Sequence, residues 1–179
     1  MKKDPLYDRR KEVNIPRLTV IILMIIVGAV LGSIIGVEVE GNEDWFWDYI
    51  NNSPQQFFRR NTIVNLIILV IVFVGGFTSA GLPFAMVGTI SKGIIASVPI
   101  TACVKLYGIS GYFIAAEKGM INNLISAIAI TIISMQSIEM SSLKRNGKKD
   151  KDSDKLYSIC FCVCAAAIIF GAAIDGFLV

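Results

Sequence analysis

Long uncharged stretches alternate with short polar or charged segments along the whole chain. A helix needs about 20 apolar residues to cross a hydrocarbon core that is ~30 Å thick, whereas the strands of a membrane β-barrel alternate over ~10 residues. The stretches here are continuously apolar and rich in Ile, Val, Leu and Ala. The pattern therefore predicts an all-α integral membrane protein, a polytopic bundle of about five transmembrane helices. The predicted spans are residues 18–37, 62–79, 84–104, 120–140 and 156–177.

Two of the breaks between these spans are short. The uncharged stretch 61–91 is too long for one span and too short for two, and the turn-type cluster at residues 80–83 divides it. Residues 106–118 contain two glycines and are expected to form a short loop before the fourth span. The first span lacks the short apolar core and the cleavage site of a signal peptide, so we interpret it as an uncleaved anchor.

Charge is unevenly distributed between the segments that flank the spans. Bases concentrate before the first span and again after residue 143, whereas the segment after the first span carries acids and no base before Arg59 and Arg60. The positive-inside rule then places both basic segments in the cytoplasm, which requires five spans. A four-span alternative with a re-entrant 82–105 segment would put the basic loop outside, which the rule disfavours. The predicted segments are the basic cytoplasmic N-terminus 1–17 and the transmembrane domain 18–179, with an extracytoplasmic segment 38–60 and a cytoplasmic loop 141–155.

The first span carries three glycines at intervals of four residues. Gly28, Gly32 and Gly36 form two overlapping G-x-x-x-G steps and lie on one face of a helix. Such a face lets another helix approach closely, which predicts tight helix packing and also allows a homo-oligomer. Chance placement is the alternative, because glycine is common in spanning helices.

The acidic segment after the first span is rich in aromatic residues. It includes Trp45, Trp47 and Tyr49, residue types that prefer the headgroup region of a membrane. We expect this stretch to lie at the outer surface, broken near Pro54. An aromatic belt explains it without further function, and a docking surface for an extracytoplasmic partner is the alternative.

A few polar residues interrupt the later spans. Lys92 falls inside the third span, where a charge is costly and is taken as functional unless it snorkels to the nearer headgroup layer. Gln136, Glu139 and Asp175 lie in or near the ends of the last two spans. Hydrogen bonding between helices is the simpler role for polar groups of this kind, and a polar transport path is the alternative.

The sequence offers no constellation for catalysis, for a cofactor or for a metal. It contains no His, the commonest general base and metal ligand, and no phosphate-binding glycine loop or G-x-S-x-G elbow. Cys160, Cys162 and Cys164 form C-x-C-x-C within an apolar run, where we expect small packing residues rather than a metal site. The basic segments alternate with acids and indicate contact with membrane lipid rather than nucleic acid. We therefore expect a protein that is not an enzyme.

Residues 57–93 contain a series of short motifs. They are Phe57, Phe58 and Asn61, the Gly75-Gly76-Phe77 end of the second span, the Gly81-Leu82-Pro83 turn and Lys92-Gly93. These motifs resemble the stage II sporulation protein M family of endospore-forming bacteria. Further matches are Asn122-Asn123-Leu124-Ile125 in the fourth span and the ending Gly171 to Phe177, which includes Asp175. The five-helix layout with one outer segment after the first span also agrees. The Cys cluster and the missing proline early in the fourth span depart from the family pattern.

The resemblance implies a scaffold rather than a catalyst. Family members sit in the mother-cell membrane at the sporulation septum and position two peptidoglycan-degrading partners, stage II sporulation proteins D and P, during engulfment. The hydrolytic chemistry would then belong to the partners. The alternative is a transport or permease subunit that works with a separate ATPase, in which Lys92, Gln136, Glu139 and Asp175 would line one polar path.

Overall fold

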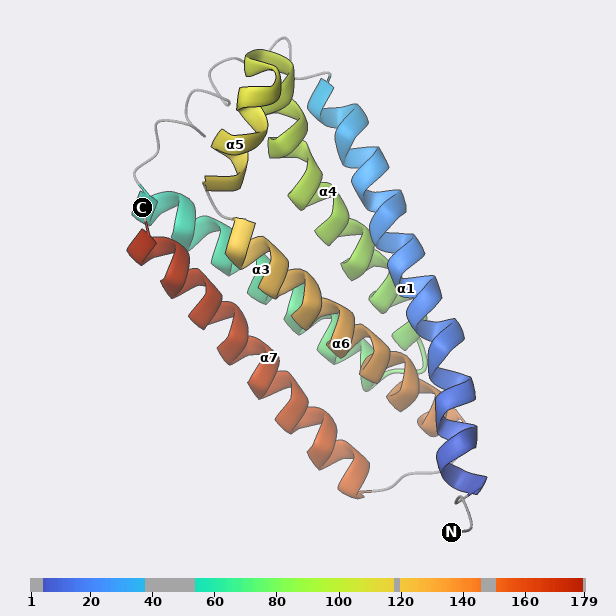
Figure 1. Ribbon diagram of the computed structural model, residues 1–179. Helices are drawn as coiled ribbons and strands as arrows, with labels where there is room; N and C mark the ends of the chain where they lie inside the picture. The colour runs from blue at the N-terminus through green and yellow to red at the C-terminus, as the bar shows by residue number, and fades with distance from the viewer. Residues whose placement is uncertain (1–4, 38–53, 118–119, 146–150, 179) are drawn as a thin grey trace.

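The computed structural model describes residues 5–37, 54–117, 120–145 and 151–178. Within these ranges the chain forms six helices and no strand. They are α1 (Pro5–Val37), α3 (Pro54–Gly76), α4 (Gly81–Tyr107), α5 (Ile109–Glu117), α6 (Met120–Arg145) and α7 (Lys151–Leu178). Successive long helices run in opposite directions, so that α1, α4 and α7 run one way and α3 and α6 run back (Figure 1).

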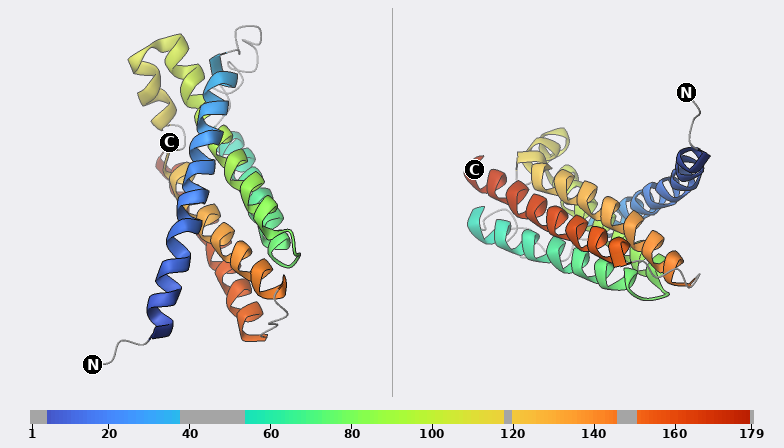
Figure 2. Two further views of the ribbon diagram at one scale, coloured as in Figure 1. Left: turned by 90° about the vertical axis from the view of Figure 1, so that its right-hand side faces the viewer. Right: turned by 90° about the horizontal axis from the view of Figure 1, so that it is seen from below.

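The helices pack in two groups that meet at α4. Helices α3, α6 and α7 lie against one another, and α1 packs along α4 at one side of the bundle, away from α7 (Figure 2). Helix α4 also contacts α3 and α6 and so joins the two groups. The largest apolar core lies between α3, α6 and α7, where Leu69, Ile133 and Ile168 are fully buried.

The outer surface of the bundle is apolar, as a membrane requires. Large apolar side chains such as Leu23, Ile67 and Phe170 are exposed, whereas several Ser, Thr and Asn side chains are buried between helices. In lipid there is little hydrophobic drive between helices, so that small and polar residues form the contacts. This inside-out distribution, together with the length of the helices, identifies an all-α multi-pass membrane protein and confirms the predicted fold class.

Within the described residues, four helical segments are long and apolar enough to cross a membrane. They are Pro16–Val37, Gly81–Tyr107, Asn122–Arg145 and Asp152–Asp175. The remaining predicted span corresponds to α3, which has 23 residues and a length of about 35 Å. Its apolar part, Arg60–Gly76, is shorter than the other four. The count of five spans therefore stays a prediction.

Several boundaries differ from those expected from the sequence. The break between the second and third spans lies at residues 77–80 rather than 80–83, because Pro83 fits in the first turn of α4, where its missing N–H leaves no helical bond unmade. Residues 106–118 were wrongly expected to form a loop, since α5 occupies most of them. Helix α6 extends to Arg145 and helix α7 begins at Lys151, so both ends of the 141–155 segment are helical.

Candidate functional site

Lys92 is buried near the middle of α4, with 1% of its surface exposed. Its ammonium donates hydrogen bonds to Asn65 Oδ1 on α3, at 2.9 Å, and to Asn123 Oδ1 on α6, at 3.0 Å. Within the described ranges no carboxylate forms an ion pair with it. The side chain therefore ends on two amide oxygens of neighbouring helices.

Asn65 is itself fixed by a second amide. It is fully buried, and its Nδ2 donates to Asn61 Oδ1 one turn earlier in α3, at 3.4 Å. Because the amide group of Asn65 uses its nitrogen toward Asn61, its oxygen is directed toward Lys92. We call these four residues, Asn61, Asn65, Lys92 and Asn123, the Lys92 cluster. It joins three helices by side-chain hydrogen bonds alone.

A carboxylate caps the start of α6 beside this cluster. Asp175, near the end of α7, accepts a hydrogen bond from the backbone N–H of Asn122, at 3.0 Å. The first N–H groups of a helix have no partner within the helix, and a negative charge at this end is stabilising. Asn122 is 2% exposed, and its side-chain Oδ1 has no hydrogen-bond partner among the described residues. The start of α6 is thus a polar position inside an apolar bundle.

Helix α5 folds back along α4, and α6 also packs against α4. Gly108 turns the chain with a φ of 61°, which is a conformation that glycine adopts without strain. Gly111 of α5 then packs against the carbonyl of Cys103, where a Cβ would overlap the α4 backbone. Helices α5 and α6 meet end to end beside α4, and α5 lies at the end of α4 farthest from the N-terminus (Figure 1). Broken helices at membrane depth are found where they are buried or line a cavity.

Polar side chains continue along the inner face of α6. Ser126, Ser134 and Ser137 are fully buried. Ser137 Oγ donates to the Val72 carbonyl of α3 at 3.0 Å, whereas Ser134 Oγ has no partner among the described residues. Ser126 Oγ donates to the Asn122 carbonyl of its own helix at 2.6 Å. Among these three hydroxyls, Ser137 therefore makes the interhelical polar bond of the kind that membrane bundles use.

The residues expected to line a polar path do not come together as one set. Gln136 is half-buried and Glu139 is exposed, and both lie in the second half of α6, toward its Arg145 end. Asp175 lies at the opposite end of that helix, beside Asn122. Of the three, only Asp175 contacts a residue next to the Lys92 cluster. It binds the N–H of Asn122, which directly precedes Asn123 in the chain.

The turn between α3 and α4 is held by α6 and α7. The Tyr157 hydroxyl of α7 donates to the Phe73 carbonyl at 3.0 Å, and its ring stacks on the Phe73 ring at a centroid distance of 4.8 Å. Lys144 of α6 donates to the Phe77 carbonyl at 2.7 Å, with its ammonium 5.0 Å from the centre of the Phe77 ring. These groups occupy carbonyls that the end of α3 leaves without helical partners.

The three glycines of α1 face α4 within the same chain. A Cβ on Gly28 would overlap the Ile90 carbonyl oxygen, and one on Gly36 would lie 2.9 Å from the Val98 carbonyl oxygen. Gly32 lies against Ile94 in the same row. The glycine face of α1 is therefore occupied by α4, and no second copy of the chain is needed to cover it.

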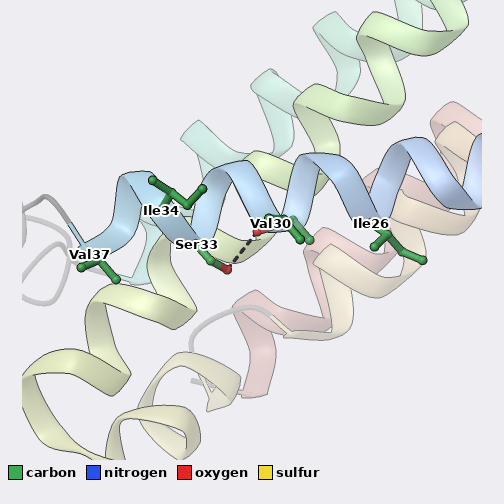
Figure 3. A pocket seen from close by; sticks show the side chains of 6 residues that line it. Ile26, Val30, Ser33, Ile34 and Val37 are labelled. Atoms are coloured by element: carbon green, nitrogen blue, oxygen red, sulfur yellow. Dashed lines mark hydrogen bonds between the residues drawn. The ribbon is translucent and has the colours of Figure 1, made fainter.

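A shallow apolar groove runs along another face of α1 (Figure 3). Its volume is about 460 Å³, and its lining residues are Ile26, Ala29, Val30, Ser33, Ile34 and Val37. The hydroxyl of Ser33 is used within the helix, because it donates to the Ala29 carbonyl at 2.9 Å. The groove is therefore almost entirely apolar and suits a lipid chain.

The remaining candidate residues contribute no further site. Trp45, Trp47 and Tyr49 lie outside the described residues. Cys162 is exposed and Cys164 is buried, and neither is in a disulfide. In the part of the chain that the structure describes, no group of three or more His, Cys, Asp or Glu residues could hold a metal ion.

Sequence reasoning identified Lys92 and Asp175 but not their partners. Asn65 carries no signal beyond being an amide in an apolar stretch, and its role depends on the register between α3 and α4. The arrangement defines a polytopic membrane protein with a buried polar cluster where α3, α4 and α6 meet. Comparison of the chain with protein-family models, with curated proteins and with solved structures gave no match.

Proposed function

We propose that this protein is a non-catalytic membrane scaffold of the stage II sporulation protein M type. In this role it would sit in the mother-cell membrane at the sporulation septum and position extracytoplasmic peptidoglycan hydrolases, stage II sporulation proteins D and P. The residues that resemble the family pattern supply the identity of the partners. The packing of those residues supplies the physical support.

The observation that carries the proposal is that several residues that match the family pattern contact one another across helices. Lys92 donates to Asn123, and Asp175 accepts from the N–H of Asn122. These residues come from α4, α6 and α7 and are 31 and 53 positions apart in the two pairs. A set of matching positions that contact one another is what a shared architecture requires, whereas matches by chance would be scattered.

The glycines of the resemblance also have a packing role. Gly76 lies against the Tyr157 hydroxyl and the Ser137 backbone, and Gly81 lies against Ser141 and the Ser137 carbonyl. A side chain at either glycine would separate α6 from the α3–α4 turn. Interactions of this kind favour one rigid arrangement of helices, which suits a scaffold.

Charge at the helix ends supports an orientation with the N-terminus in the cytoplasm. Helix α1 begins, α6 ends and α7 begins at the same end of the bundle (Figures 1 and 2). Lys144, Arg145 and Lys155 lie at this end. The positive-inside rule assigns such an end to the cytoplasm, which leaves the segment between α1 and α3 outside, where wall hydrolases act.

Deletion in a spore-forming host tests the proposal. Membrane-dye microscopy should reveal a block at engulfment, with bulging or persistent septal wall, and a tagged chain should co-purify with both hydrolases. A chain that carries Lys155→Ala, at an exposed position, is the control. When it is returned to the deletion strain, it should restore engulfment. Unimpaired engulfment after deletion would exclude the scaffold role.

A transport subunit with a separate ATPase partner is the second candidate. The observation that favours it is the contact of the buried Lys92 with Asn123 in the first turn of α6, since helix ends next to intramembrane charges often form substrate sites. Flux of a solute in proteoliposomes that contain the chain and its ATPase would favour transport. Engulfment assays then separate the two candidates, because a transporter need not retain hydrolases at the septum.

A further inference from the structure

The structure assigns a monovalent-cation site to the amide oxygens of Asn65 and Asn123, and we propose that its resident cation is the ammonium group of Lys92 itself. The site is independent of the scaffold role. It follows from the geometry around one atom, Lys92 Nζ, and from the acceptors that face it.

The two oxygens are arranged as ligands for a cation. They belong to different helices, α3 and α6, and lie 2.9 Å and 3.0 Å from Nζ. Asn65 is fully buried and Lys92 is 1% exposed, whereas Asn123 is half-buried, so bulk solvent has little access to the ammonium group. The bond from Asn65 Nδ2 to Asn61 Oδ1 holds the Asn65 oxygen toward the ammonium. Protein oxygens placed in this way can replace the hydration shell of an ion.

The described contacts give the site two protein ligands. An ammonium has three N–H donors, and Lys92 Nζ uses two of them toward the oxygens of Asn65 and Asn123. The side-chain oxygen of Asn122, the residue before Asn123, is buried but makes no bond to Lys92. The site is therefore defined by the two amide oxygens from α3 and α6.

The charges around the site fit a cation with a single charge. Asp175 is the one carboxylate that the described contacts bring to the start of α6, and it binds the N–H of Asn122 rather than Lys92. Divalent cations in proteins are usually held by several carboxylates, whereas neutral amide and carbonyl oxygens suit K⁺. An ammonium group and K⁺ are of similar size and both bind neutral oxygens. Removal of the Lys92 side chain should thus leave a vacated site that K⁺ or methylammonium can fill.

The test uses Lys92→Ala in the full chain, purified in detergent. Its melting temperature is measured in KCl, in methylammonium chloride and in choline chloride at the same ionic strength. We expect K⁺ and methylammonium to raise the melting temperature saturably, by about 5 °C, because a ligand that binds only the folded state stabilises it. Choline is too large to enter and should give no shift. Wild-type protein should respond equally to all three salts, since its site is filled.

Lys92→Met is the matched control. Its side chain fills the space without a charge, so K⁺ and methylammonium should not stabilise it beyond choline. Equal responses of the Ala and Met variants, or of the Ala variant to K⁺ and choline, would overturn the proposal. A Lys92→Ala variant that fails to fold in every salt would overturn it as well, because the small cations must replace the lost ammonium. Recovery of folded protein only in KCl or methylammonium chloride would support it.

Discussion

Asp175, near the end of α7, accepts a hydrogen bond from the backbone N–H of Asn122, 53 residues earlier, at 3.0 Å. The bond ties the end of the last helix to the start of α6. It also places a negative charge where the helix macrodipole is positive. Asn122 is 2% exposed, so bulk water has little access to this N–H group. The carboxylate is therefore a cap for α6.

Removal of this cap should destabilise the bundle. Asp175→Ala leaves the Asn122 N–H without its acceptor and should lower the free energy of unfolding by about 0.5–2 kcal/mol. Asp175→Asn keeps an oxygen acceptor and should lose less, since asparagine also caps helices. Unfolding by SDS or by heat in detergent measures both variants. Glu139→Ala, at an exposed position of α6, is the control and should change stability by less than about 0.5 kcal/mol. Equal losses for the Ala and Asn variants would show that charge, not hydrogen bonding, is what matters.

Close packing of α1 on α4 depends on Gly28. Its replacement by Leu would drive side-chain atoms into the Ile90 carbonyl and should separate the two helices, at a cost of about 1–3 kcal/mol. Val27→Leu adds one methylene at a neighbouring exposed position and should be neutral. Thermal unfolding compares the stability of the two variants. A cysteine pair, with one cysteine on α1 and one on α4, reports by loss of its crosslink whether the two helices have separated. Undiminished stability and crosslinking in Gly28→Leu would contradict the packing of α1 on α4.

The Tyr157 hydroxyl should contribute measurably to stability by holding the α3–α4 turn. Tyr157→Phe keeps the ring, which stacks on Phe73, and removes the donor to the Phe73 carbonyl. The free energy of unfolding should fall by about 1 kcal/mol, as for a typical buried hydrogen bond. Tyr112→Phe removes a hydroxyl from a side chain that is 47% exposed and should have little effect. A loss for Tyr157→Phe no greater than that of Tyr112→Phe would mean that the ring alone fixes the turn.

The sequence was sufficient for the fold class because spanning length and apolarity are properties of single segments. Lys92 and Asp175 were identifiable for a related reason, since a charge inside an apolar stretch is costly and therefore conspicuous. Their partners were not identifiable, because a hydrogen bond from Lys92 to Asn65 depends on how α3 and α4 are aligned. The spacing of polar residues within one helix does not contain that information.

Helix α5 illustrates why local signals can mislead. Its region was expected to be a loop because Gly108 and Gly111 interrupt an otherwise apolar stretch. Gly108 does turn the chain, as its positive φ requires. Gly111 instead lies within α5, where the absence of a side chain allows contact with the Cys103 carbonyl of α4. The same residue type thus marks a turn at one position and a helix contact three residues later.

The crossing of α3 can be tested by cysteine accessibility. In a background with the native cysteines replaced by alanine, single cysteines are placed at Arg60 and Thr78, which are exposed positions near the two ends of the apolar part of α3. A membrane-impermeant maleimide on intact cells without an outer wall barrier should label position 60 and spare position 78 until the cells are permeabilised. Cysteines at Ser110, on α5, and Asp152, at the start of α7, report the sides on which the later helix ends lie. The charge rule predicts that Ser110 labels from outside and Asp152 only after permeabilisation. Labelling of positions 60 and 78 from the same side would mean that α3 does not cross and that the chain has four spans, which would move the basic ends of α6 and α7 relative to the N-terminus.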